Sequence, residues 1–139
     1  TLTYFQVTDQ GAAASRKYVS VDGGMSDNIR SALYEAEYSA TIASRSSDAE
    51  ATLSRVVGKH CESGDIVVRH ALLPADVSVN DLLAVPATGA YCFSLSSNYN
   101  YLPRPAVIAV KGGSAKVLIR AETERDLLGR DAGYEPGEA

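Results

Sequence analysis

The residues best suited to chemistry stand together in one short segment, Gly58-Lys59-His60-Cys61-Glu62-Ser63-Gly64-Asp65. A thiol next to a carboxylate suits proton transfer and polar recognition, because a thiol acts as an acid or a nucleophile when neighbouring charge tunes it. The cations Lys59 and His60 favour the thiolate form of Cys61, whereas Glu62 opposes it. Free cysteine is also among the most buried residue types. A small buried cysteine beside a solvated acid therefore stays open as the alternative.

Three further groups of residues have the chemistry to bind a ligand. The pair Gly23-Gly24 allows a ligand or another segment to approach the backbone closely, or it simply forms a turn. Arg30 and Tyr34 are four residues apart, so on a helical turn they share a face and could hold a carboxylate. A solvated arginine beside a core tyrosine is the alternative for this pair. Tyr91 could present its ring and hydroxyl to a planar ligand.

A metal site is not expected. Four side chains have ligand chemistry, but their spacing matches no zinc motif: His60, Cys61, His70 and Cys92.

These residues need elements to position them, and strand patterns outnumber helix patterns. Residues 34–42 alternate apolar and polar side chains with a period of two, which predicts a strand with one buried face. Lys111-Gly112-Gly113-Ser114 predicts a hairpin turn, because glycine accepts positive φ. The polar segment 44–50 predicts an exposed loop. The other predicted strands are 2–7, 18–21, 51–57, 66–68, 82–86, 106–110 and 116–119.

Helix is predicted only in short pieces. Residues 90–95 form a possible turn of helix, and residues 123–128 a helical start with Thr123 as N-cap. We expect one mainly antiparallel β-domain over residues 1–128, a sandwich or barrel with one or two short helices, and a flexible tail over residues 129–139.

Composition limits the possible classes of protein. A chain of 139 residues with 45% hydrophobic content predicts a single globular domain. Its net charge of -4 and its lack of a basic block argue against nucleic acid as a partner. No apolar stretch approaches the ~20 residues that cross a bilayer, and no signal peptide opens the chain. Two cysteines are too few for a disulfide-built secreted domain, which favours the cytoplasm.

Four motifs in a fixed order resemble a known family. Asp22-Gly23-Gly24-Met25, Arg30-Ser31-Ala32-Leu33-Tyr34, the Cys61-Glu62-Ser63 segment and Thr88-Gly89-Ala90-Tyr91 are similar to the C-terminal part of the diaminopimelate decarboxylases. These belong to the pyridoxal-phosphate decarboxylases with an alanine-racemase-like fold. The resemblance covers about residues 17 to 128. It implies that an N-terminal α/β barrel, which carries the cofactor lysine, lies outside this chain.

The resemblance also implies a role for each candidate residue. Arg30 and Tyr34 match residues that bind the distal carboxylate of meso-diaminopimelate, and Glu62 matches the acid that receives its distal ammonium. Tyr91 matches a tyrosine that reaches both pyridoxal phosphate and substrate. Cys61 matches the cysteine thought to donate the proton that replaces carbon dioxide. In the family the Cys-Glu loop enters the active site of the other subunit, so a homodimer is expected.

Some expectations follow from differences between this chain and the family. Ser31 stands where the motif usually has proline, which we expect to loosen the turn that carries Arg30. Without the barrel lysine, this chain alone should be inactive. The alternatives are a decarboxylase of another basic amino acid, or a stand-alone β-domain for binding or dimerisation.

Overall fold

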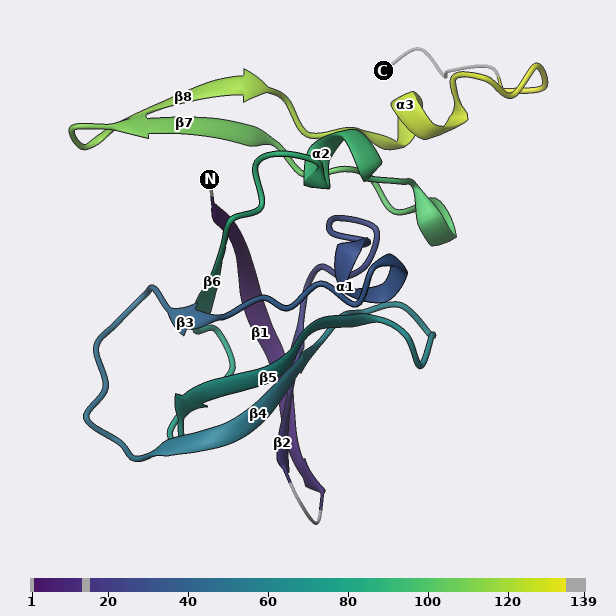
Figure 1. Cartoon of the computed structure of the whole chain (residues 1–139). Coiled ribbons are helices and arrows are strands. Elements are labelled where there is room, and N and C mark those ends of the chain that lie inside the picture. Colours follow the sequence, from purple (N-terminus) through teal and green to yellow (C-terminus); the bar gives the residue numbers. More distant parts are fainter. Residues whose placement is uncertain (1, 14–15, 135–139) are drawn as a thin grey trace. The chain divides into compact units, whose positions relative to one another are not determined.

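The computed structural model describes residues 2–13 and 16–134 (Figure 1). Contacts divide the chain into two compact units, Thr1–Ser96 and Ser97–Ala139. The expected division into a domain of residues 1–128 and a flexible tail of residues 129–139 stays a prediction. Residues 135–139 of that tail lie outside the described residues.

The first unit is a six-stranded, strongly curved sheet. Its two edge strands, β3 and β5, approach each other, so the sheet nearly closes into a barrel. All neighbouring strands are antiparallel except β2 and β4, which are parallel. This confirms the predicted mainly antiparallel β fold. In sheet order the strands are β3 (Thr41–Ile42), β6 (Leu82–Pro86), β1 (Leu2–Ala13), β2 (Arg16–Val21), β4 (Ala51–Val57) and β5 (Ile66–Pro74).

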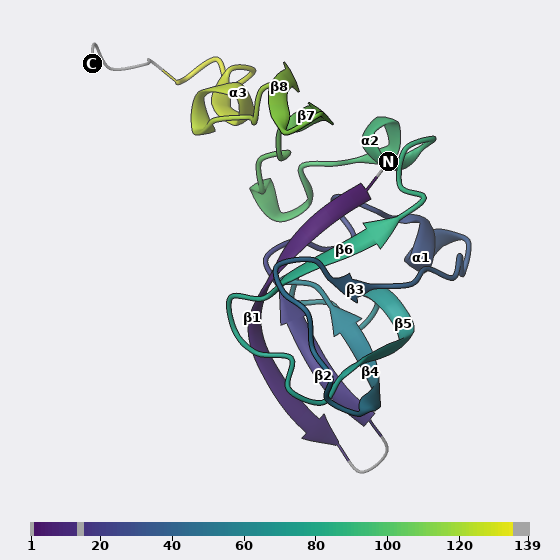
Figure 2. The ribbon, with the colours of Figure 1, turned by 90° about the vertical axis from the view of Figure 1, so that its left-hand side faces the viewer.

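The long strand β1 serves two neighbours. Its first half pairs with β6 and its second half with β2 (Figure 2). The register of the β1–β2 pair shifts between Val7 and Asp9. Such an irregularity bends a strand and increases its twist. Buried side chains of the strands, together with Val77 from the β5–β6 connection, form the apolar core: Phe5, Val7, Val19, Val21, Val56, Val67, Val68, Ala71, Leu73, Val77, Leu83 and Val85.

The predicted strand over residues 34–42 is wrong except at its end. Helix α1 (Arg30–Leu33) precedes this stretch, and only Thr41–Ile42 pairs with a neighbouring strand. Glu35 has a φ of 54°, a left-handed conformation that cannot continue a strand. Tyr38, Ala40 and Ile42 nevertheless pack against the core. The alternation therefore reports burial, not strand pairing.

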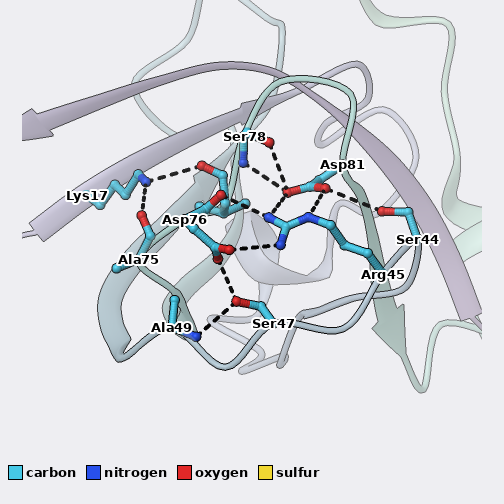
Figure 3. A network of polar contacts seen from close by, with 10 residues as sticks. Lys17, Ser44, Arg45, Ser47, Ala49, Ala75, Asp76, Ser78 and Asp81 are labelled. Carbon is cyan, nitrogen blue, oxygen red and sulfur yellow. Dashed lines mark hydrogen bonds and ion pairs between the residues drawn. The ribbon is translucent and has the colours of Figure 1, made fainter.

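The predicted loop over residues 44–50 is fastened to the β5–β6 connection by Arg45 (Figure 3). Its guanidinium binds both carboxylate oxygens of Asp81 at 2.7 and 2.8 Å, and the Asp76 carboxylate at 2.9 Å. Hydrogen bonding to Arg45 lowers the pKa of Asp81. The Asp76 pKa is also lowered, first by the hydroxyl of Ser47 and then by Arg45.

The first unit ends after helix α2 (Cys92–Leu95), which agrees with the turn of helix predicted over residues 90–95. The second unit contains a 3₁₀ turn, η1 (Tyr99–Tyr101), the hairpin of β7 (Val107–Lys111) and β8 (Ser114–Ile119), and α3 (Glu124–Leu128). Gly112 and Gly113 both have positive φ, as the predicted turn requires. Thr123 caps α3 in a capping box with Asp126, which confirms the predicted N-cap.

Candidate functional site

The topology brings the predicted motifs to one end of the first unit. Because β1 is antiparallel to both β2 and β6, and β4 is parallel to β2, strands β2, β4 and β6 all run in the same direction. The segments that follow these three strands therefore leave the sheet at the same end. They carry, in turn, the Gly-Gly motif and Arg30, the Cys61-Glu62 loop, and Tyr91.

The first two of these segments are joined directly. The Lys59 amide donates a hydrogen bond to the Gly23 carbonyl at 2.9 Å. The His60 ring lies buried, with Nε2 2.9 Å from the Ser26 hydroxyl. His60 thus directs its imidazole inward toward the Gly-Gly segment, while the Cys61 thiol is exposed. Within this chain, Cys61 is therefore not a buried cysteine.

Asp27 lies beside the contact between the Gly-Gly segment and the Cys61-Glu62 loop. Its Oδ2 accepts a hydrogen bond from the Gly24 amide at 3.0 Å. Burial raises the pKa of the Asp27 carboxyl, while the Gly24 amide and the charge of Lys59 act in the opposite direction. An acid at this place stabilises the Gly-Gly turn and adds a partly buried negative charge near Lys59.

A second group forms around Arg30, at the first residue of α1. Its guanidinium donates to the Tyr38 hydroxyl at 3.1 Å, and its Cζ lies 5.8 Å from the centre of the Tyr91 ring. The latter distance is within the range of a cation–π contact. The Tyr38 hydroxyl also lies 3.9 Å from the sulfur of buried Cys92. The structure therefore brings Arg30 and Tyr91 together, as expected of residues in one site.

Tyr38 was not predicted as a site residue. Its place in the alternating pattern of residues 34–42 indicated a core tyrosine, and its ring does pack against the core. Only the hydroxyl takes part in the site, where it holds Arg30. The polar end of a half-buried tyrosine close to a candidate arginine was the available signal.

Tyr34 follows directly after α1, and its amide closes the last turn by donating to the Arg30 carbonyl. The helical spacing expected for Arg30 and Tyr34 is thus present. The Tyr34 side chain is 61% exposed, and in the described part of the chain no hydrogen bond joins it to the Arg30 side chain. No hydrogen bond or ring contact joins Cys61 to Arg30, Tyr34 or Tyr91 within residues 2–13 and 16–134.

Ser31 is buried and makes hydrogen bonds of its own, and the loosening of the turn relative to proline stays a prediction. It is 1% exposed, and its hydroxyl donates to the Val67 carbonyl on β5 at 2.9 Å. The Arg69 guanidinium in turn donates to the Ser31 carbonyl at 3.0 Å. Ser31 therefore joins α1, and with it Arg30, to strand β5.

The described residues hold no group of three or more His, Cys, Asp and Glu side chains arranged for a metal ion. None of the helices in the described ranges is long and apolar enough to cross a bilayer.

Comparison with known proteins shows the family. Residues 2–89 match the family model described as pyridoxal-dependent decarboxylase, C-terminal sheet domain. The diaminopimelate decarboxylase of Mycobacterium leprae is 56% identical over 133 residues, 92% of this chain and 28% of the relative. That of Bacillus subtilis is 47% identical over 88% of this chain and 28% of the relative.

Solved structures agree. Diaminopimelate decarboxylase from Helicobacter pylori, complexed with L-lysine, is 30% identical with a TM-score of 0.81, covering 92% of this chain and 31% of that one. A chlorella virus arginine decarboxylase shares the fold at 17% identity and a TM-score of 0.63, covering 71% of this chain and 27% of that one. The chain thus spans less than a third of the length of these relatives. By the match over residues 2–89, the chain belongs to the pyridoxal-dependent decarboxylases, as their C-terminal sheet domain.

Proposed function

We propose that this chain is the C-terminal part of a diaminopimelate decarboxylase, which converts meso-diaminopimelate to L-lysine. The observation that carries the proposal is the placement of Arg30 against Tyr91, on motifs of a chain 56% identical to a diaminopimelate decarboxylase. A substrate with an amino-acid group at both ends needs a cation for its distal carboxylate and an acid for its distal ammonium.

Arg30 and Tyr34 bind the distal carboxylate. The Tyr38 hydroxyl holds the Arg30 guanidinium from one side, so the cation is oriented before substrate arrives. Tyr34 is exposed and one helical turn further on, and its hydroxyl is free to turn toward a carboxylate bound at Arg30. A decarboxylase of ornithine or arginine has no distal carboxylate to bind, which makes this pair the determinant of substrate choice.

Cys61 and Glu62 act on the substrate from the exposed loop. Glu62 receives the distal ammonium. Cys61 donates the proton that replaces the departing carboxylate. Because the Cys61 thiol is exposed, it can regain a proton from solvent after each turnover.

The residues of this chain fit pyridoxal phosphate only in part. The cofactor supplies an electron-accepting ring for decarboxylation. Tyr91 is 61% exposed and offers its ring and hydroxyl to it. Lys17 does not serve as the cofactor lysine, because its ammonium donates to the carbonyls of Ala75 and Val77. We assign the cofactor lysine and the phosphate site to an N-terminal barrel, so this chain alone is inactive.

The surface near the site exposes an apolar patch. Large apolar side chains on and beside α1 and α2 are exposed: Leu33, Tyr34, Tyr91, Phe93 and Leu95. Exposed apolar patches of this kind mark protein interfaces. We assign the partners as the barrel and an identical subunit, with the Cys61-Glu62 loop serving the active site of the other subunit. We also propose that the enzyme is cytoplasmic.

The test uses the full-length enzyme. Cys61→Ala should lower kcat by about 10²-fold or more with little change in KM, because general-acid catalysis contributes that much. Glu62→Ala should raise KM for diaminopimelate. Glu50→Ala, which removes an exposed glutamate from the loop over residues 44–50, is the control and should behave as wild type. If Cys61→Ala keeps full turnover, the proton-donor assignment is wrong.

Sharing of active sites across a dimer is tested by mixing. Cys61→Ala protein is combined with an equal amount of a variant that lacks the cofactor lysine. Random reassociation makes half of the dimers mixed, and each mixed dimer has one intact site of two, so about a quarter of wild-type activity should return. No recovery after verified subunit exchange would refute the shared site.

A further inference from the structure

A single buried carboxylate closes the loop that carries Cys61 and Glu62. Asp65 is only 3% exposed. One carboxylate oxygen accepts the His60 amide at 2.7 Å, and the other accepts the Met25 amide at 2.6 Å. The main chain of Asp65 adds two more bonds, from its amide to the Glu62 carbonyl at 3.1 Å and from the Gly58 amide to its carbonyl at 2.9 Å. Asp65 thus joins both ends of the loop to each other and to the Gly-Gly segment.

Two glycines make room for this carboxylate. A Cβ added at Gly24 would lie 2.6 Å from Asp65 Oδ1, and one added at Gly58 would also collide with the carboxylate. Among the described residues, positive φ occurs at glycine only at Gly112 and Gly113. Backbone conformation therefore does not require glycine at positions 24 and 58. Close approach of the Asp65 side chain does.

The Cys61–Glu62 part of the loop lies outside the apolar core. Residues 61–64 are all exposed, so they do not pack into the core. The Glu62 amide donates to the His60 carbonyl at 2.8 Å, which makes a tight turn, and His60 is one of the two residues whose amides Asp65 binds. Asp65 thus anchors the residue at which this turn begins.

We propose that Asp65 is a positioning residue for the Cys61–Glu62 pair. By accepting the amides of His60 and Met25 it fixes where the loop starts and how it lies against the chain that leads to Arg30. Bonds from amides to a charged acceptor are stronger than those between neutral groups, so a carboxylate serves this purpose better than an amide side chain. The inference rests on the proposed function for its catalytic consequence, but the closure of the loop does not.

The primary test is Asp65→Asn in the full-length enzyme, a change that keeps shape and one acceptor oxygen. The other oxygen becomes an NH₂ group, which cannot accept an amide. Hydrogen–deuterium exchange should rise about tenfold or more in peptides covering residues 22–28 and 58–65. The kcat should fall and KM for diaminopimelate should rise together, since Cys61 and Glu62 are both displaced.

The matched control is Asp81→Asn. Asp81 is also buried and also accepts a main-chain amide, that of Ser78 at 2.9 Å, but it belongs to the β5–β6 connection. Its variant should increase exchange around Ser78 and leave kcat and KM unchanged at a temperature where it is folded. If Asp81→Asn alters kcat and KM as much as Asp65→Asn does, the effect is general destabilisation and the proposal is overturned.

A second variant keeps the carboxylate and displaces it. Gly24→Ala should reproduce the exchange and kinetic changes of Asp65→Asn, and combining Gly24→Ala with Asp65→Ala should cost less than the sum of the single changes. Unchanged exchange at residues 58–65 in both variants overturns the proposal. Wild-type enzyme without activity on diaminopimelate overturns the proposed function instead, and closure by Asp65 is then judged on exchange alone.

Discussion

Replacing Ser31 by alanine should destabilise the first unit, although the change removes only one oxygen atom. The Ser31 side chain is buried, and its hydroxyl donates to the Val67 carbonyl at 2.9 Å. Strand β5 is an edge strand with β4 as its only sheet neighbour, so this bond supplies a partner on the side of β5 that faces away from β4. Leaving a buried carbonyl unpaired costs about 1–3 kcal/mol. For a unit of this size the loss corresponds to a decrease in Tm of about 4–24 °C.

Thermal unfolding followed by circular dichroism measures this effect, with Ser94→Ala as the matched control. The Ser94 hydroxyl also donates to a main-chain carbonyl, that of Tyr91 at 3.1 Å, but this bond is exposed. Because water replaces an exposed partner, Ser94→Ala should change stability by no more than about 0.5 kcal/mol. A Tm for Ser31→Ala within about 1 °C of wild type, or an equal loss for both variants, would refute the reasoning.

Two further predictions concern polar groups elsewhere in the first unit. Tyr38→Phe removes the hydroxyl that accepts a hydrogen bond from the Arg30 guanidinium. Steady-state kinetics of the full-length enzyme should show KM for diaminopimelate raised about three- to tenfold, with kcat changed less. An unchanged KM would contradict the role given to Tyr38. Arg45→Met should weaken the dependence of the free energy of unfolding on pH in the acid range. Folding lowers the pKa values of Asp81 and Asp76. The stabilisation that these carboxylates give is therefore full above the unfolded carboxyl pKa of about 3.9, and it is lost as the pH falls through the lower folded values. The difference in Tm between wild type and Arg45→Met should therefore be constant from about pH 7 to pH 5 and shrink below that, and a difference that grows toward acid would contradict it.

Elements that depend on local pattern were predictable from the sequence. Strands β4 and β6 have the predicted bounds, the Gly112-Gly113 turn forms, and Thr123 caps α3. Strands β1 and β5 run further than predicted. Polar residues such as Arg69 and His70 interrupt the apolar pattern of β5, yet the strand continues through them because β4 pairs along its length.

The failure over residues 34–42 has a physical cause. Side chains at every second position are partly buried from Ala36 to Ile42, as the pattern indicates. The backbone, however, lies mostly away from a strand neighbour, and the left-handed Glu35 separates it from α1. Periodicity reports which side chains face the core, and it carries no information about which strand supplies the hydrogen bonds.

Part of the candidate site was predictable from residue type and spacing. The Cys61-Glu62 pair and Arg30 stood out by residue type, and the structure gives each a defined setting. Asp65 was missed because its role depends on a contact distant in the sequence, whereas Tyr38 was missed because the alternating pattern assigned it to the core. Asp65 binds an amide 40 residues away, and only the pairing of β2 with β4 brings the two segments together.

The parallel pairing of β2 and β4 explains why the separate motifs lie at one end of the first unit. In a sheet whose strands alternate in direction, successive connections lie at alternate ends. Here β2, β4 and β6 run in the same direction, so the Gly-Gly segment with Arg30, the Cys61-Glu62 loop and Tyr91 all leave from one end. The six-stranded sheet of the first unit holds the ends of these segments in place. Hydrogen bonds to a few buried polar side chains, among them Ser31 and Asp65, fix the segments that carry the exposed residues. Substitutions that alter substrate choice should therefore be tolerated at the exposed positions of these segments, while changes at Ser31, Asp65, Gly24 or Gly58 should affect stability and activity together.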